Sequence, residues 1–365
     1  MKFNFPMIFG EWLNMLMLGP SGYGKSTFLK HCAIEFMRKG GRIVWFDIYK
    51  SCFATTSLVN GSHVNLGNIA NEKFFAPLKT LSQHRAIEFL CMLCEIEGIN
   101  ITHEIKSSIS DAVQLIKTQS PDQQTLSNFI NYVMDHKIKS ALHEYTSNGS
   151  YALFDALDDQ INLTGQWTCF EVKELFDNKA MLQVTLLYLL SYIENLSDGI
   201  PTIVIIDDAG HVFSSKSFRK WLKTSLNNFR KKGISFWFAF HNVTDFDGGI
   251  RDTILNACRI KVFTPNSQIL INNSIKTAYQ SLGLNERQLE LLGNATPCKE
   301  YMIQDESSNT QLIDLMIQPG SISQTVCGGS GTGSISLMEN LIKKHGHDKA
   351  IKQYLNKKGV HCGVV

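Results

Sequence analysis

The order of apolar and polar positions along this chain predicts an α/β fold built around a buried, mainly parallel sheet. Short apolar runs recur through the sequence, and several of them end in a carboxylate or a tight turn. Continuous runs of this length are typical of strands covered on both faces, and the helix-like stretches between them favour parallel pairing. The strands expected from this pattern are 14–18, 42–47, 165–171, 203–206, 234–240 and 259–263.

Helices are expected beside these strands, and one long region contains helices alone. Residues 26–39 have helical composition and stop at a Gly-Gly pair, which is a typical helix end. A second helix is expected at about 178–195. Between residues 81 and 150 no strand pattern is visible, so we interpret this region as an all-helical insertion. The helical segments expected within it are 85–97, 102–117 and 124–145.

The insertion divides the α/β domain into residues 1–80 and 151–320. Within the second part, 301–304 and 311–316 predict a hairpin at the sheet edge. Residues 321–365 form a C-terminal region, with a Gly/Ser-rich link at 328–333 and a polar helix expected at 336–355. The apolar start, 1–18, lacks a cleavage-site pattern and runs straight into a glycine-rich turn, so its end is interpreted as the first core strand.

That glycine-rich turn fits the pattern G-x-x-x-x-G-K-[ST] without a gap. Glycines let backbone N–H groups surround phosphate oxygens, and the start of the following helix adds a favourable dipole. Lys25 is expected to reach the β- and γ-phosphates, and the Ser26 hydroxyl to bind Mg²⁺, so ATP and Mg²⁺ are the expected cofactors. The nucleotide-binding residues expected are Gly19, Pro20, Ser21, Gly22, Tyr23, Gly24, Lys25, Ser26 and Thr27.

Two other strands end in residues that suit a nucleotide site. The run 203–206 ends in Asp207 and Asp208. Asp207 is expected to hold the Mg²⁺ shell, and Asp208 is the candidate for polarising the attacking water. The alternative for both aspartates is that the strand simply ends in an acidic turn. His241 follows the strand 234–240 at the same edge of the sheet. It is expected either to sense the γ-phosphate or to be an ordinary histidine whose hydrogen bonds are satisfied at the end of the strand.

Composition excludes several other classes of protein. The 365 residues are 44% hydrophobic, which indicates a folded chain rather than a disordered one. The net charge is +2, so no overall basic field indicates nucleic acid, although a local basic groove is not excluded. Nine scattered cysteines are typical of reduced thiols. The most apolar stretch, 181–192, is too short to cross a bilayer, so no transmembrane segment is expected.

Further short segments occur in a recognisable order along the chain. They are Phe3-Asn4-Phe5, Trp45-Phe46-Asp47, Phe75-Ala76-Pro77-Leu78, 126–145, Tyr151-Ala152-Leu153-Phe154-Asp155, Phe170-Glu171, Ile205-Ile206-Asp207-Asp208-Ala209, Thr264-Pro265-Asn266, Ser334-Ile335-Ser336 and Gly346-His347-Asp348. Together with the phosphate loop, this series resembles the motor half of the type IV secretion and conjugative-transfer ATPases of the TrbE/CagE kind.

The resemblance implies a RecA-like P-loop NTPase that works as an oligomer, often a hexamer. It also implies a place in the bacterial cytoplasm, peripheral at the cytoplasmic face of the inner membrane. There such a protein energises a secretion or conjugation apparatus and contacts its inner-membrane components. Family members carry a large N-terminal domain, whereas this chain starts a few residues before the phosphate loop. We therefore expect that domain to be absent here, or encoded separately.

This sequence departs from the family pattern at two polar positions. Asp208 stands where the family has Glu, and His241 stands where the family has Gln. Asp is one methylene shorter than Glu, a shortfall on the order of 1.5 Å. Because a misplacement of about 1 Å can cost roughly 10²-fold in rate, we expect secure ATP binding and weakened hydrolysis.

An oligomeric motor of this kind also needs an arginine supplied across the subunit interface. Arg230 matches a basic family segment just before a strand, with Arg251 and Arg259 as further candidates. A solvated basic turn is the alternative for each. Cys91 and Cys94 form a C-x-x-C without a second pair, and they are interpreted as core cysteines. A metal site is not expected at the terminal group His345, His347, His361 and Cys362.

Three hypotheses follow for function. The first is an ATP-hydrolysing motor subunit of a type IV secretion or conjugative DNA transfer apparatus. The second is a DNA-pumping translocase of the same superfamily, for which DNA would be a partner. The third is a nucleotide-binding assembly subunit with weak or no hydrolysis, which the changes at Asp208 and His241 favour.

Overall fold

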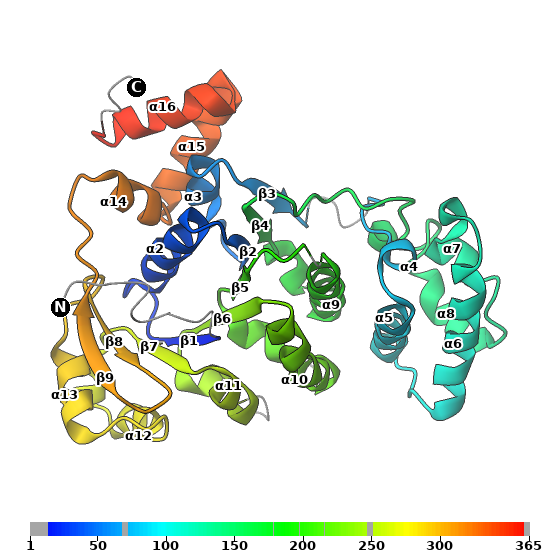
Figure 1. Cartoon of the computed structure of the whole chain (residues 1–365), viewed down its shortest axis with the longest axis horizontal. Coiled ribbons are helices and arrows are strands. Elements are labelled where there is room, and N and C mark those ends of the chain that lie inside the picture. Colours follow the sequence, from blue (N-terminus) through cyan, green and yellow to red (C-terminus); the bar gives the residue numbers. More distant parts are fainter. Residues whose placement is uncertain are drawn as a thin grey trace.

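The fold is a nine-stranded sheet with helices on both faces and a helical insertion at one side (Figure 1). The computed structural model describes residues 14–67, 72–177, 179–196, 198–214, 216–246 and 251–360. The strand order is β3-β4-β2-β5-β6-β1-β7-β8-β9. The strands are β1 (Met15–Leu18), β2 (Arg42–Asp47), β3 (Ser62–Asn65), β4 (Trp167–Glu171), β5 (Thr202–Ile206), β6 (Ile234–Phe240), β7 (Ile260–Phe263), β8 (Glu300–Gln304) and β9 (Thr310–Asp314).

The pairing of the strands confirms the expected α/β class. Neighbouring strands from β3 to β7 pair in parallel, and only β8 and β9 are antiparallel. All six strands expected from the apolar runs occur, and β8 and β9 form the expected edge hairpin. Strand β3 was not foreseen because its residues, Ser62 to Asn65, are only partly buried at the far edge of the sheet. Residues 1–13 of the apolar start, which include the segment Phe3-Asn4-Phe5, lie outside the described residues.

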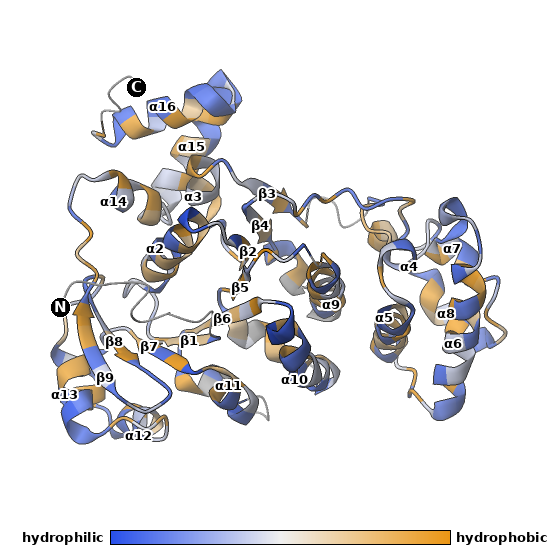
Figure 2. Ribbon diagram, in the orientation of Figure 1, coloured by the Kyte–Doolittle hydropathy of each residue, from blue (hydrophilic) through white to orange (hydrophobic). Residues whose placement is uncertain are grey.

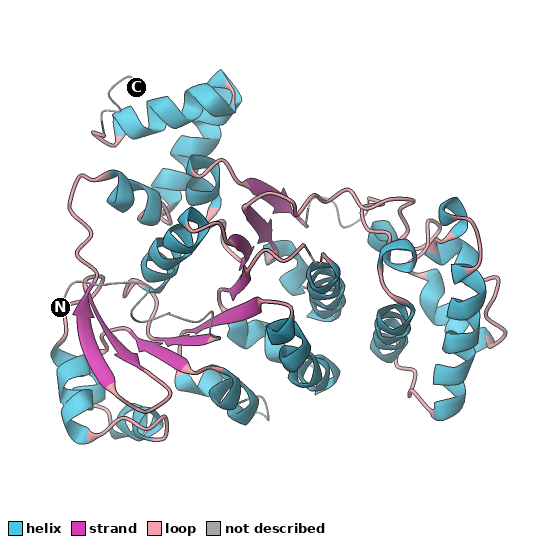
Figure 3. Ribbon diagram, viewed as in Figure 1, coloured by secondary structure: helices cyan, strands magenta, loops and turns pink. Residues whose placement is uncertain are grey.

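Alternate residues of each central strand enter two separate hydrophobic cores. In β1, Leu16 and Leu18 belong to one core, whereas Met15 and Met17 belong to the other. This is the burial expected of a parallel sheet covered on both faces. Helix α2 (Lys25–Arg38) packs in the smaller core, with Phe28 and Phe36 fully buried. Helices α9 (Lys179–Asn195) and α10 (Lys216–Lys231) cover the opposite face (Figure 3).

The remaining helices surround this frame. Near α2 and in the insertion they are α3 (Phe53–Leu58), α4 (Pro77–Thr80), α5 (Gln83–Ile96), α6 (His103–Lys117), α7 (Leu126–Phe129) and α8 (His136–His143). In the second half they are α11 (Arg251–Ala257), α12 (Asn273–Gln280), α13 (Glu286–Asn294), α14 (Ile322–Cys327), α15 (Thr332–His345) and α16 (His347–Lys357). Short 3₁₀ turns link them at 121–123, 152–154, 173–177, 209–214, 243–246 and 267–270.

Two helix predictions were wrong because each joined two helices into one. The segment 124–145 contains α7 and α8, and each starts at its own N-cap, Thr125 and Asp135. The Asp135 carboxylate accepts hydrogen bonds from two backbone N–H groups of α8, which fixes a new helix start. The segment 336–355 contains α15 and α16, which are separated by Gly346 at φ 75°. His361 and Cys362 lie outside the described residues.

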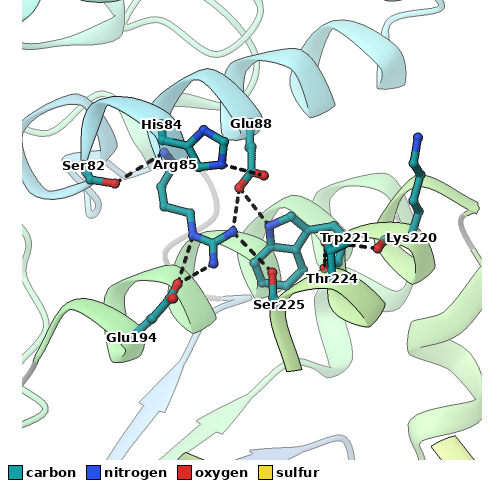
Figure 4. A network of polar contacts seen from close by, with 9 residues as sticks. All are labelled: Ser82, His84, Arg85, Glu88, Glu194, Lys220, Trp221, Thr224 and Ser225. Atoms are coloured by element: carbon teal, nitrogen blue, oxygen red, sulfur yellow. Dashed lines mark hydrogen bonds and ion pairs between the residues drawn. The ribbon is translucent and has the colours of Figure 1, made fainter. Parts of the chain in front are cut away.

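A buried polar network joins the insertion to the sheet-covering helices (Figure 4). Arg85 of α5 is only 7% exposed, and its guanidinium donates to Glu194 of α9, with Nε 2.9 Å from Oε2. The same side chain contacts Glu88 and the Ser225 hydroxyl of α10. The Trp221 indole N–H donates to Glu88 at 3.1 Å. The insertion is therefore tied to helices α9 and α10 by paired charges as well as by apolar packing.

Substitution of Arg85 by alanine is predicted to destabilise the fold strongly. The change leaves Glu194, which is 6% exposed, as a buried carboxylate without its partner. Removing one member of a buried pair typically costs about 3–5 kcal/mol. Chemical denaturation monitored by circular dichroism measures the free energy of unfolding. The double variant Arg85→Met/Glu194→Met is the control and should recover much of the stability, and a decrease in Arg85→Ala below about 1 kcal/mol contradicts the account.

Candidate phosphate-binding site

The glycine-rich turn lies between the end of β1 and the start of α2, as the sequence predicts. Gly24 is the N-cap of α2 at φ 95°, a conformation that favours glycine. A Cβ atom there would lie 2.4 Å from the Tyr301 hydroxyl and 2.9 Å from the Cα of Cys298. The turn can therefore keep its shape only with glycine at this position, and several of its residues line a cavity.

That cavity has a volume of about 430 Å³ and lies at the carboxyl edge of the parallel strands. Loop residues from Ser21 to Thr27 form one wall. Asp47, the last residue of β2, and Asp207 and His241, which directly follow β5 and β6, form another. Ser330 and Gly331 from the C-terminal region complete the lining. The parallel register thus brings together side chains that are up to about three hundred residues apart in sequence.

Lys25 is the cation at the centre of this site. Its side chain is 5% exposed, and Nζ donates to the carbonyl oxygens of Gly19 at 2.6 Å and Pro20 at 3.1 Å. Nζ also lies 2.7 Å from Nδ1 of His241. Burial lowers the pKa of Lys25, and the charges of Asp207 and Asp208 oppose that effect. The amine is therefore poised within the loop, where a phosphate oxygen could replace the neutral carbonyl partners.

Ser26 and Asp207 meet as the sequence predicts. The Ser26 hydroxyl donates to Oδ2 of Asp207 at 3.1 Å. Burial raises the pKa of Asp207 to about 6, and the charges of Asp47 and Asp208 act in the same direction. A hydroxyl and a carboxylate side by side, with neighbouring negative charge, are the oxygen ligands that Mg²⁺ prefers. The residues present therefore fit a magnesium ion.

Asp208 and His241 also meet, but in a way that the sequence did not suggest. Asp208 adopts φ 56°, a left-handed conformation that is uncommon for a residue other than glycine. Its Oδ1 forms an ion-pair contact with Nε2 of His241. The imidazole therefore lies between the Lys25 amine and the Asp208 carboxylate. Asp208 is thus turned toward His241 in this conformation.

The arginine candidates lie away from this cavity. Arg230 is exposed at the end of α10, directly before β6 begins, so it lies at the amino edge of the sheet. Arg259 precedes β7 at the same edge and pairs with Glu306 at 3.2 Å. Arg251 is the first residue of α11, and its guanidinium donates a hydrogen bond to the Ser281 hydroxyl. None of the three lines the cavity formed by the described residues of this chain.

Several residues around the site were not singled out from the sequence. Cys298 Sγ lies 3.3 Å from the Gly22 carbonyl, and the Tyr301 hydroxyl donates to the Gly24 carbonyl at 3.1 Å. These contacts brace the phosphate loop from β8 and the turn before it. No local motif marks either residue, because they reach the loop only through the antiparallel addition of β8 to β7.

Asp47 could have been found from the sequence, since it ends an apolar strand as Asp207 does. It is 1% exposed and accepts hydrogen bonds from the Ser51 hydroxyl at 2.8 Å and the Cys52 N–H at 2.7 Å. Lys30 is fully buried, and its positive charge favours the ionised form of Asp47. The Lys30 Nζ also donates to Ser330 Oγ at 2.6 Å. Asp47 thus holds the turn that forms one wall of the cavity.

Glu171 extends this row of carboxylates along the sheet edge. It pairs with Asp47 in the β2–β4 register and accepts the Lys50 N–H at 2.6 Å. Burial raises the pKa of Glu171 to about 7, and the charge of Asp47 acts in the same direction. The folded protein therefore holds a proton on Glu171 at pH values where the unfolded chain has released it.

The stability of the protein is predicted to fall with rising pH through this group. Because the folded pKa of Glu171 exceeds the unfolded value of about 4.5, its contribution to stability is present at low pH and disappears between about pH 4.5 and 7. Urea denaturation at pH 5 and pH 7.5 measures this change for wild type and Glu171→Gln. The free energy of unfolding should decrease less from pH 5 to pH 7.5 in Glu171→Gln than in wild type, by on the order of 1 kcal/mol or more. Equal decreases in the two proteins would contradict the raised pKa of Glu171.

The comparisons with known proteins agree with this geometry. The family model of the TraG P-loop domain matches residues 6–328. The conjugal transfer protein TrbE of Rhizobium radiobacter is 31% identical over 363 residues, which cover 94% of this chain and 43% of that protein. This chain therefore spans less than half the length of that relative. The resemblance to type IV secretion and conjugative-transfer ATPases is confirmed.

Solved structures show the same fold. The structure of VirB4 of Thermoanaerobacter pseudethanolicus matches with a TM-score of 0.69 at 16% identity, covering 85% of this chain and 91% of that one. The plasmid coupling protein TrwB, in complex with the non-hydrolysable ATP analogue ADPNP, matches with a TM-score of 0.55 at 13% identity, covering 84% and 85%. With the family model covering most of its length, this chain belongs to the family of TraG P-loop domains.

Proposed function

We propose that this chain binds Mg²⁺–ATP and hydrolyses it to energise a type IV secretion or conjugative DNA transfer apparatus. The observation that carries the proposal is the 3.1 Å contact between Ser26 and Asp207 beside the buried Lys25 amine. It combines a phosphate loop, a cation for phosphate and a pair of magnesium ligands in one cavity. The similarity to TrbE supports the cellular role.

Each part of the site has a role in this proposal. Backbone N–H groups of residues 19–27 hold the phosphates, with Lys25 on the β- and γ-phosphate oxygens. Ser26 and Asp207 would hold the magnesium ion, which would supply positive charge to offset the negative charge of the transferring phosphoryl group. Water then attacks the γ-phosphorus, and the bond from that phosphorus to the β–γ bridging oxygen breaks. The products are ADP and inorganic phosphate.

Asp208 and His241 form the part of the site that controls the attacking water. Asp208 accepts the proton of that water or orients it, provided that its carboxylate leaves His241. While Asp208 pairs with His241, the imidazole lies beside Lys25, where it can report whether a γ-phosphate has engaged the amine. In this proposal the pairing slows hydrolysis without weakening ATP binding.

The site gains an arginine from a neighbouring subunit in this proposal. Among the described residues that line the cavity, Lys25 is the only Lys or Arg, so a second cation for the γ-phosphate would come from outside this lining. Arg230 is exposed on the opposite sheet edge of the same chain, so it can act only on another copy. A ring, hexameric as the family resemblance suggests, supplies such an arrangement.

The proposed place of action is the cytoplasmic face of the bacterial inner membrane, in contact with secretion or conjugation components. No helix in the described ranges is long and apolar enough to span a bilayer.

A second candidate function is an assembly subunit that binds nucleotide and cycles poorly. The left-handed Asp208 and its pairing with His241 favour this alternative. A DNA-pumping translocase is the third candidate, and turnover stimulated by DNA would support it.

Lys25→Ala is predicted to weaken Mg²⁺–ATP binding by about 100-fold or more and to abolish hydrolysis. The change removes the buried amine from the phosphate loop, and hydrogen bonds to charged groups contribute about 1.5–3 kcal/mol each. Isothermal titration calorimetry gives the dissociation constant, and phosphate release gives the rate. Lys343→Ala, an exposed lysine of α15, is the matched control. Wild-type affinity in Lys25→Ala would refute the assignment of the whole site.

Asp208→Glu is predicted to raise the rate of hydrolysis several-fold without changing ATP affinity. The longer side chain restores a reach of about 1.5 Å toward the attacking water. Steady-state phosphate release at saturating ATP measures the effect, and Asp208→Asn should lower the rate below wild type. A rate for Asp208→Glu at or below that of wild type would show that Asp208 does not act on the water.

A further inference from the structure

A threonine at the end of β7 carries a hydroxyl that the fold leaves without a partner. Thr264 directly follows β7 and begins the segment Thr264-Pro265-Asn266. Its side chain is fully buried, and its Oγ1 forms no hydrogen bond with any residue that the structure describes. A buried hydroxyl without a partner costs free energy in the folded protein, so its presence at this position calls for an explanation.

The parallel register places this hydroxyl against the phosphate loop. Figure 2 shows β6 and β7, the two neighbours of β1, mainly in the colours of hydrophobic residues. Phe263 of β7 pairs with Leu18 of β1, and the Thr264 N–H donates to the Leu18 carbonyl at 2.9 Å. Gly19 therefore lies beside Thr264. A Cβ atom on Gly19 would lie only 1.7 Å from Thr264 Oγ1, so this close approach requires glycine in the loop.

The two residues after Thr264 hold it in this place. Pro265 restricts the backbone of the residue before it to extended conformations. Asn266 is 7% exposed, and its N–H donates to the Leu292 carbonyl at 3.3 Å. The side-chain amide of Asn266 also donates to the Tyr279 hydroxyl at 3.4 Å. The Thr264 hydroxyl therefore stays beside Gly19 and can gain a partner only through a small local movement.

The Gly19 carbonyl is the acceptor that comes to need a donor here. In the structure, Lys25 Nζ donates to this carbonyl at 2.6 Å, in buried surroundings. When Lys25 turns to the β- and γ-phosphate oxygens, the carbonyl loses that donor. A buried acceptor left without a donor carries the cost of its lost hydration. An unpartnered donor thus lies next to an acceptor that nucleotide binding would leave unpartnered.

We propose that Thr264 is a positioning residue whose hydroxyl donates to the Gly19 carbonyl when Lys25 turns to the phosphates. The inference rests on the proposed binding of Mg²⁺–ATP by the phosphate loop. The exchange keeps the carbonyl hydrogen-bonded, so Lys25 leaves it at a smaller cost and the loop keeps its shape. Thr264 is not among the described residues that line the cavity, so it acts through Gly19 and Lys25.

The experiment removes the hydroxyl while keeping the shape of the side chain. Isothermal titration calorimetry with the magnesium complex of ADPNP compares wild type, Thr264→Val and Thr264→Ser, which retains the hydroxyl. Thr185→Val is the matched control, because Thr185 of α9 is also fully buried and its hydroxyl also lacks a partner among the described residues. It lies on the face of the sheet opposite to α2. Thermal unfolding of each protein without nucleotide gives its Tm.

The two valine variants should differ only when nucleotide is bound. Without nucleotide, both should have a Tm equal to or above that of wild type, because each loses an unpaired buried hydroxyl. Thr264→Val should bind Mg²⁺–ADPNP about 10-fold more weakly, the effect of losing one hydrogen bond to a buried carbonyl. Thr264→Ser and Thr185→Val should bind the analogue as wild type does.

Three results would overturn this inference while leaving the proposed function intact. One is wild-type affinity in Thr264→Val. Another is an equal loss of affinity in Thr264→Ser, since the hydroxyl would then not be the group responsible. The third is a lower Tm of Thr264→Val without nucleotide, which would mean that the hydroxyl is already bonded in the free protein. Failure of wild type to bind Mg²⁺–ADPNP would refute the proposed function, and this inference with it.

Discussion

The parallel alignment of β2, β5, β6 and β1 is the constraint on which the candidate site depends. Leu18 pairs with Phe240, and Phe46 pairs with Ile206, so the phosphate loop, His241, Asp47 and Asp207 all leave the sheet at one edge. A shift of one residue in any of these pairings would move the side chains that a strand buries on one face of the sheet to the opposite face. The two hydrophobic cores, one on each face, fix the register and thereby set the 3.1 Å distance between Ser26 and Asp207.

The same alignment creates an electrostatic problem that a bound cation would solve. Glu171, Asp47 and Asp207 lie at the carboxyl ends of three adjacent strands, and burial raises the pKa of each of these carboxyl groups. The buried cations nearby are Lys25 and Lys30, both on α2. Once all three carboxyl groups are ionised, negative charge exceeds positive charge at this edge, which disfavours bare triphosphate and favours its magnesium complex. Charge balance thus gives a physical reason for the proposal that the loop and Asp207 bind Mg²⁺ and nucleotide together.

The sequence was sufficient for features that depend on local pattern. The phosphate loop, the strand that ends in Asp207 and the edge hairpin all follow from residue spacing or apolar runs. The breaks at Asp135 and Gly346 were missed because a capping side chain or a single left-handed glycine can end a helix inside an otherwise continuous helical pattern. The pairing of Asp208 with His241 and the support from Tyr301 could not be predicted, because they depend on contacts between distant strands.

The central claim is that this chain holds a complete site for binding Mg²⁺–ATP but needs a neighbouring copy to hydrolyse it. Steady-state ATP hydrolysis by the purified chain, measured per subunit across a wide range of protein concentration, tests that claim most directly. The Lys25→Ala variant supplies the background rate. We predict a rate per subunit that rises with concentration and then reaches a plateau. A rate that is constant over the whole range, either well above the background or equal to it, would contradict the claim.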